Sequence, residues 1–196
     1  MKDLYNRKNK FYFKILFINI LFILFFTIAT NFIFEKYDNS LEDNYKKEPL
    51  IYFLFIVFIS PIIEEFIFRF PLKFNNKNIF IIPIILLFIF ISDFLIAKFF
   101  FLLFFICLII QLITEKNVKI IYFLSIICFG IIHLDNYNSI NDSIIENIVL
   151  IFPQLLLGTI LTFIRIHENI KSSILYHSIY NLIILLISTF VVNEIS

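Results

Sequence analysis

The chain has little of what a soluble protein carries on its surface. Charged residues make up 16% of its 196 residues, well below the roughly 25% typical of soluble globular chains. It has no tryptophan and only two glycines, whereas 61% of its residues are hydrophobic and 29 are phenylalanine. With a mean hydropathy of +0.96, this composition excludes a soluble globular domain and indicates an integral membrane protein.

Two further scarcities exclude other classes of protein. The net charge is +1, and no basic face is visible in the sequence, which excludes a nucleic-acid partner. Cys107 and Cys128 lie in separate apolar segments without ligand spacing, so both are predicted to be small core side chains rather than parts of a disulfide framework or a zinc knuckle. The wealth of Phe, Ile, Asn and Lys is typical of an AT-rich coding sequence and favours a bacterial inner or plasma membrane.

Apolar runs of membrane-spanning length predict an all-α, polytopic helical bundle. Measured against the roughly 20 residues that cross a bilayer, the sequence gives about seven helices, with six to eight as the range: 12–34, 50–72, 79–97, 99–114, 119–135, 144–164 and 172–192. Only Asp93 and Lys98 interrupt the third and fourth runs, which we interpret as a helical hairpin. We see no internal repeat or linker, so 1–196 is predicted to be a single integral membrane domain, with an N-terminal anchor helix and loop over 1–49 and a core over about 50–192.

The distribution of Lys and Arg places the N-terminus in the cytoplasm. With this orientation, twelve of the 16 basic residues fall on cytoplasmic flanks and four fall outside, as the positive-inside rule requires. The first apolar segment is longer than that of a signal peptide, and no small-residue cleavage site follows it. We therefore interpret it as a retained anchor.

Two adjacent glutamates lie inside one of these apolar segments. Residues 50–70 read LIYFLFIVFISPIIEEFIFRF, in which Glu64, Glu65 and Arg69 are the only charges. A charge near the bilayer centre costs roughly 2.5–3.5 kcal/mol on insertion scales, which makes the cluster a functional candidate. Glu65 and Arg69 stand one helical turn apart and can pair. Glu64 points about 100° away around the helix, and an unpaired carboxylate in a low dielectric can take up a proton.

Two histidines lie near the ends of other apolar segments. The stretch FGIIH ends on His133, and His177 stands one turn before Asn181. The latter pair can present two donors toward a single point, which stabilisation of an oxyanion requires. We expect these three residues and Glu64 to face one water-accessible cavity, provided that both histidines lie well inside the bilayer on tilted or displaced helices.

The other polar residues in the apolar segments have plainer interpretations. His167 lies in a basic loop and is expected to be interfacial. Asp93 and Glu146 lie near predicted segment ends and are expected to be solvated. Pro61 and Pro153 are expected to kink their helices.

Taken in order, the three polar groups resemble the motifs of a known family. Glu-Glu-x-x-x-Arg, Phe-x-x-x-His and His-x-x-x-Asn occur within residues 64–181, and this pattern is similar to that of the CPBP family of intramembrane glutamic endopeptidases. That family includes the eukaryotic CAAX prenyl proteases and bacterial proteins linked to bacteriocin maturation or self-immunity. By this resemblance, Glu65 and Arg69 support the site.

The resemblance also implies a mechanism and a partner. Glu64 and His133 would activate a water that attacks a peptide carbonyl, and His177 and Asn181 would form the oxyanion hole. The substrate would be a small peptide or the C-terminal tail of a membrane-associated protein. No metal or other cofactor is needed in this scheme.

The same residues allow two other interpretations. Glu64, His133 and His177 are ligands that zinc accepts, although the His-Glu-x-x-His helix of membrane zinc proteases is absent. A non-catalytic immunity protein or a proton-coupled transporter would use the same polar cavity to bind a peptide or move protons. The weak internal symmetry expected of a transporter is not visible.

Overall fold

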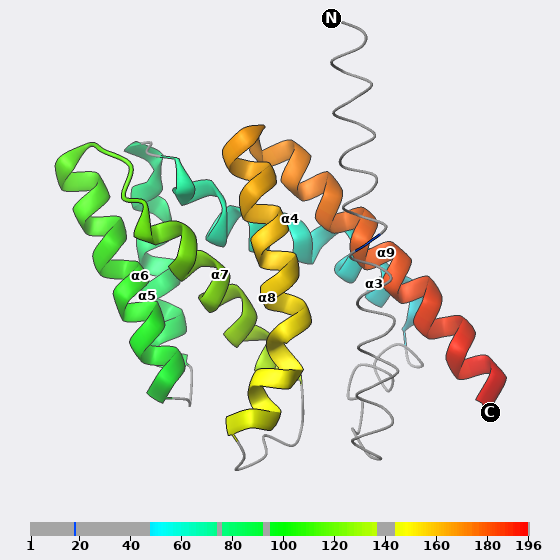
Figure 1. The fold of residues 1–196 in the computed structure, drawn as a ribbon. Helices are drawn as coiled ribbons and strands as arrows, with labels where there is room; N and C mark the ends of the chain where they lie inside the picture. The colour runs from blue at the N-terminus through cyan, green and yellow to red at the C-terminus, as the bar shows by residue number, and fades with distance from the viewer. Residues whose placement is uncertain (1–17, 19–47, 74–75, 92–94, 137–143, 196) are drawn as a thin grey trace, which may run out of the picture.

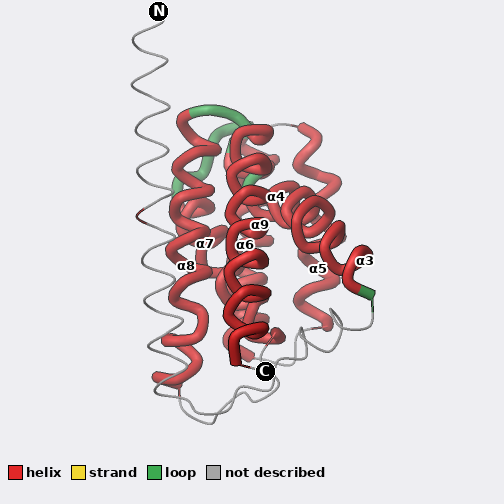
Figure 2. The backbone as a smooth tube through the Cα atoms, turned by 90° about the vertical axis from the view of Figure 1, so that its right-hand side faces the viewer, coloured by secondary structure: helices red, strands yellow, loops and turns green. Residues whose placement is uncertain are grey.

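The computed structural model describes residue 18 and residues 48–73, 76–91, 95–136 and 144–195, and within these ranges the regular elements are all helical (Figures 1 and 2). The all-α prediction is therefore confirmed for this part of the chain. The elements, with η marking a π or 3-10 turn, are α3 (Pro49–Leu54), η1 (Phe55–Ile59), α4 (Ser60–Phe68), η2 (Phe70–Leu72), η3 (Asn76–Ile81), α5 (Ile82–Ile91), α6 (Leu95–Thr114), α7 (Ile120–Ile132), η4 (His133–Asn136), α8 (Ile144–His167) and α9 (Ile170–Ile195). The predicted anchor helix over 12–34 lies outside the described residues, apart from Ile18.

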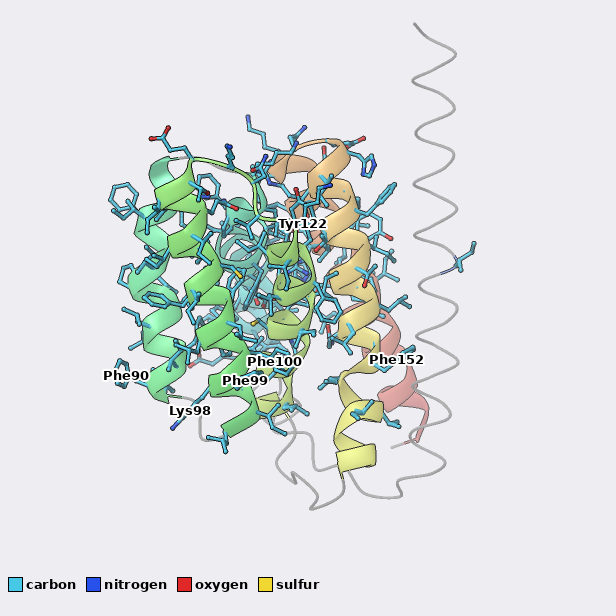
Figure 3. The ribbon with its side chains drawn as sticks, turned by 60° about the vertical axis from the view of Figure 1, so that its left-hand side comes forward. Phe90, Lys98, Phe99, Phe100, Tyr122 and Phe152 are labelled. Carbon is cyan, nitrogen blue, oxygen red and sulfur yellow. The ribbon has the colours of Figure 1, made fainter. Side chains whose placement is uncertain are left out.

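Several described helices are apolar enough for a bilayer. Two are also long enough to cross one, Pro49–Leu72 and Leu95–Thr114, and four shorter apolar helices accompany them. Large apolar side chains cover the outer surface, among them Phe90, Phe99 and Phe152, which are 80%, 56% and 42% exposed (Figure 3). Such a surface suits lipid rather than water. The count of seven spans and the orientation remain predictions.

The predicted boundary inside the run 79–114 was wrong. α5 ends at Ile91 and α6 begins at Leu95, so α6 runs through Lys98, where the sequence pattern predicts an interruption. A lysine is tolerated near the end of an apolar helix because its four-carbon stem carries the ammonium toward the interface. α5 and α6 pack against each other, and they form the hairpin expected between the first two motifs.

The helices that carry the motifs pack in an order that brings them together. α7 packs between α6 and α8, and α9 packs against α8, α4 and η1. α3, α4 and α9 run obliquely to the steeper α5, α6 and α8 (Figure 1). The α6–α7 and α8–α9 connections lie at the same end of the bundle (Figure 1).

Both glycines of the chain lie where α7 and α8 cross. A Cβ built on Gly130 of α7 would lie 2.5 Å from Leu155 Cδ2, and one built on Gly158 of α8 would lie 3.1 Å from Phe129 Cδ1. A helix pair approaches this closely only where side chains are absent. A larger residue at either position would therefore require a neighbouring side chain to shift.

The carbonyl groups at the end of α4 bond to side chains from other helices. Ser125 Oγ of α7 donates to Phe68 O at 2.7 Å, Gln111 Nε2 of α6 donates to Pro71 O at 2.8 Å, and Arg165 Nε of α8 donates to Arg69 O at 3.0 Å. Because Phe68, Arg69 and Leu72 are buried within the protein, the last carbonyls of this helix need such partners from neighbouring helices. These bonds fix the segment that carries the two glutamates against three neighbouring helices.

Candidate functional site

Glu64 holds its two carboxylate oxygens in different surroundings. Ser60 Oγ, one turn earlier on α4, donates to Oε1. Oε2 is buried without a hydrogen-bond partner among the described residues, and it lies 3.8 Å from His133 Nε2 and 3.7 Å from His177 Nε2. These separations are too long for direct N–H···O bonds.

His133 reaches Glu64 because α7 is short. Its 13 residues rise only about 20 Å, less than the roughly 30 Å of a bilayer core. Nδ1 of His133 lies 2.7 Å from Phe129 O. Since a carbonyl only accepts hydrogen bonds, Nδ1 carries the proton, and Nε2 of the neutral ring offers its lone pair on the side of Glu64.

His177 lies on α9 between the two glutamates. Its Nδ1 is 3.2 Å from Glu65 Oε1, and its side chain is 2% exposed. The carboxylate accepts the Nδ1 proton, which fixes both the tautomer and the orientation of the ring. The Phe129 ring packs against both imidazoles, with centroids 4.7 Å from His133 and 5.7 Å from His177.

Glu65 and Arg69 form the buried pair that their spacing predicts. Arg69 Nε lies 3.6 Å from Glu65 Oε1, and both side chains are fully buried. Ser173 Oγ donates to the other carboxylate oxygen of Glu65. The guanidinium of Arg69 lies 4.0 Å from the centroid of the Phe129 ring, in the geometry of a cation–π contact. The pair thus connects α4 to α7 and, through His177, to α9.

The side chain of Asn181 bonds to the backbone of η1, whereas its motif suggests a donor that faces the oxyanion together with His177. Its Nδ2 donates to Ile56 O in η1 at 2.9 Å, which uses one of its two amide N–H groups. The structure therefore brings Glu64, His133 and His177 together, and it ties Asn181 to the backbone ahead of α4.

Sequence reasoning missed the two serines that hold the glutamates. Ser60 stands four residues before Glu64, and Ser173 stands four residues before His177. This spacing places two side chains on one face of a helix, so the signal was present in the sequence. A polar side chain one turn from a motif residue in an apolar helix is the feature to look for.

The remaining polar residues lie outside this cluster. His167 is exposed near the end of α8, with Nδ1 2.9 Å from Phe163 O. Asp93 and the side chain of Glu146 lie outside the part of the chain that is described. Cys107 and Cys128 are free and buried, as predicted.

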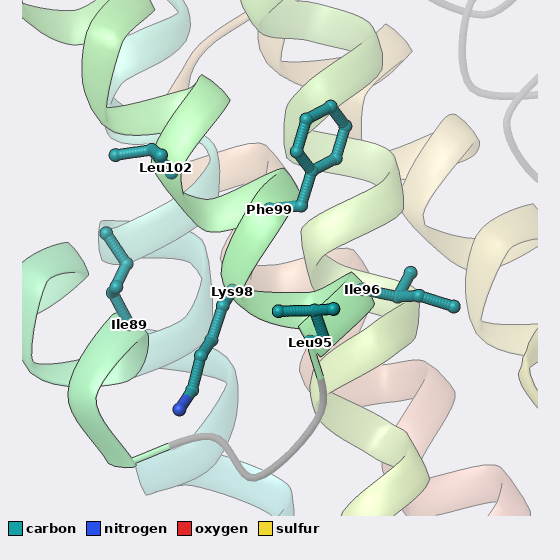
Figure 4. A pocket seen from close by; sticks show the side chains of 6 residues that line it. All are labelled: Ile89, Leu95, Ile96, Lys98, Phe99 and Leu102. Atoms are coloured by element: carbon teal, nitrogen blue, oxygen red, sulfur yellow. The ribbon is translucent and has the colours of Figure 1, made fainter.

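A pocket of about 520 Å³ opens on the outer surface of the α5–α6 hairpin (Figure 4). Its lining is apolar except for one lysine: Ile89, Leu95, Ile96, Lys98, Phe99 and Leu102. None of the motif residues contributes to it. The candidate site is therefore the polar cluster between α4, α7 and α9. Within the ranges described, no group of three His, Cys, Asp or Glu residues is arranged to hold a metal ion.

Gly158→Ala is expected to destabilise the protein. The new Cβ would lie 3.1 Å from Phe129 Cδ1 and 3.2 Å from Arg69 Nη2, closer than ordinary van der Waals contact, and overpacking of this kind typically costs about 1–3 kcal/mol. The measurement is the apparent Tm in detergent. Thr159→Ala, on the exposed face of the same helix, is the matched control, and a Tm for Gly158→Ala equal to that of wild type would contradict the close approach of α7 and α8.

Comparison with known proteins gives one family. The family model described as "Type II CAAX prenyl endopeptidase Rce1-like" matches residues 46–183, which is well over half of the chain and includes all three motifs. Searches against curated proteins and against solved structures gave no match.

Proposed function

The chain belongs to the Rce1-like family of type II CAAX prenyl endopeptidases, and on this premise we propose that it hydrolyses a peptide bond with a water activated by Glu64 and His133. Family membership makes it a membrane protein of a protease family that acts on a peptide or protein. The observation that carries the proposal is the position of Glu64 Oε2, 3.8 Å and 3.7 Å from the Nε2 atoms of two histidines.

The hydrogen bonds at the site support one set of proton movements. His133 is held with its Nε2 lone pair on the side of Glu64, so in this proposal it accepts a hydrogen bond from a water that enters beside the two side chains and orients that water. Glu64 takes the second proton of this water while the water oxygen attacks the carbonyl carbon of the substrate. When the tetrahedral intermediate collapses, Glu64 returns the proton to the leaving amine.

The negative charge of the intermediate needs donors, which His177 and Asn181 supply in this proposal. The Nδ1 proton of His177 bonds to Glu65, so Nε2 donates to the oxyanion when the ring carries both protons. Asn181 has a second amide N–H beyond the one bonded to Ile56. Each preorganised donor of this kind is worth about 10²–10³ in rate.

We propose a small peptide, or the C-terminal tail of a membrane-associated protein, as the substrate in a bacterial inner or plasma membrane. Glu64 and His133 are 17% and 15% exposed, whereas Glu65 is fully buried, which supports an approach of the substrate from the side of Glu64 and His133. The test is cleavage by purified protein in lipid vesicles of two reporter peptides, one with a prenylated cysteine near its C-terminus and one without. Cleavage of neither would contradict the proposal.

Chelation of metal is expected to leave the cleavage rate unchanged. In this mechanism Glu64 and His133 activate the water without a metal ion, so EDTA and a tight zinc chelator remove nothing that the reaction uses. The measurement is the initial rate of reporter cleavage with and without chelator, with a zinc protease assayed in the same buffer as the control. Loss of activity that zinc restores would instead support a zinc site formed by Glu64, His133 and His177.

A further inference from the structure

The segment ahead of α4 contains a π-helical turn whose pattern of hydrogen bonds is interrupted. In η1, the backbone N–H of Ser60 bonds to Phe55 O, five residues earlier. The next bond in this register would join the N–H of residue 61 to Ile56 O. Residue 61 is a proline, which has no N–H to donate. The Ile56 carbonyl therefore needs a donor from elsewhere, because an unsatisfied carbonyl is costly in apolar surroundings.

Asn181 is that donor. Its Nδ2 lies 2.9 Å from Ile56 O and reaches it from α9, 125 residues further along the chain. α9 packs directly against η1 and α4, so the bond forms within an existing helix contact. A side-chain N–H from α9 thus stands where a backbone N–H would stand in an uninterrupted helix.

The π turn determines the direction in which Glu64 faces. One extra residue in a helical turn rotates everything after it by about 100° relative to what precedes it. Ser60 lies at the end of this turn, and its Oγ holds Oε1 of Glu64, which leaves Oε2 facing the histidines. A return to regular α-helical register would rotate the α4 residues relative to α3.

We propose that Asn181 is a positioning residue: its amide replaces the N–H that Pro61 lacks and so holds the π turn in the register that directs Glu64 at His133 and His177. The claim that Asn181 directs Glu64 at the histidines rests on the proposed function. The claim that its amide replaces the missing N–H of Pro61 does not. The second amide N–H of Asn181 remains for the oxyanion.

A double-mutant cycle between Pro61 and Asn181 tests this exchange. Asn181→Ala alone is expected to lower the apparent Tm by about 2–4 °C, the effect of roughly one hydrogen bond in a chain of this size, and to lower kcat. Pro61→Ala supplies the missing backbone N–H. In that background Asn181→Ala should cost little Tm, and the double variant should have a kcat about tenfold above that of Asn181→Ala, since misplacement of a reacting group by about 1 Å costs up to 10²-fold.

Pro153→Ala is the matched control, because Pro153 also lies inside a helix, in α8. Its removal should leave the effect of Asn181→Ala unchanged. Additive losses of Tm in the Pro61 cycle would overturn the exchange of donors, and a regained Tm without any gain in kcat would overturn the positioning of Glu64. The Tm measurements need no substrate. If they show coupling between Pro61 and Asn181 while the protein cleaves no reporter peptide, the proposed function is overturned but the exchange of donors is not.

Discussion

Glu64→Gln is expected to give a protein that folds in the membrane but turns over its substrate about 10²–10⁴ times more slowly than wild type. Glutamine keeps the shape of the side chain, and its amide oxygen can still accept the bond from Ser60. Its NH₂ group, however, cannot take a proton from the attacking water. The change also removes a charge that is costly to insert into a bilayer, so the apparent Tm should not fall.

The measurement combines kcat/KM on the reporter peptide with apparent Tm in detergent. Glu115→Gln, on the exposed residue that follows α6, makes the same chemical change away from the cluster and should behave as wild type. Full activity of Glu64→Gln would refute the role of this carboxylate as the proton acceptor. A non-catalytic immunity protein would show no turnover even as wild type, so the same kcat/KM measurement separates it from a protease.

Glu65→Ala and Arg69→Ala are each expected to destabilise the protein by about 3–5 kcal/mol, the usual effect of leaving one buried charge without its partner. Both side chains are fully buried. Glu65→Ala also removes the acceptor of the His177 Nδ1 proton, and Arg69→Ala removes the cation that packs on the Phe129 ring. Both variants should therefore lose activity as well as folded protein.

The double variant Glu65→Gln/Arg69→Met distinguishes the pair from its members. It removes both charges and keeps much of the side-chain volume, so its stability should exceed that of either alanine variant. Its activity should stay low, because a neutral amide in place of the Glu65 carboxylate supports His177 less well. The measurements are the apparent Tm and the yield of folded protein. Single variants as stable as wild type would show that the Glu65–Arg69 pair contributes nothing to stability.

Local spacing predicted the parts of the site that lie within one helical turn. Glu65 and Arg69 pair as four-residue spacing on an apolar helix suggests, and the same spacing would have revealed Ser60 and Ser173. The meeting of Glu64 with His133 and His177 is of another kind. It depends on the short α7 and the oblique α9, so the sequence suggested it only through the order of the three motifs.

The features that the sequence did not reveal depend on backbone register and packing. Nothing in the spacing of His177 and Asn181 indicates that the amide of Asn181 bonds to η1, because the need for that bond arises from a π turn 125 residues earlier. Pro61 was the available signal, and we interpreted it only as a kink. The boundary between α5 and α6 was misplaced for another reason. The sequence pattern took Lys98 as an interruption, whereas a lysine near the end of an apolar helix can extend its ammonium toward the interface.

The bonds at the end of α4 also have a consequence for biosynthesis. Arg165, which donates to the carbonyls of Arg69 and Phe70, follows Arg69 by 96 residues, and a ribosome that adds about 5–20 residues per second needs roughly 5–20 s to make them. Until then the segment that carries the glutamates has Gln111 and Ser125 as partners but lacks Arg165, the donor to the carbonyls of Arg69 and Phe70. A nascent chain that ends before α8 carries both glutamates and His133 but lacks Arg165, Ser173 and His177, so the site is complete only after α9 has been made.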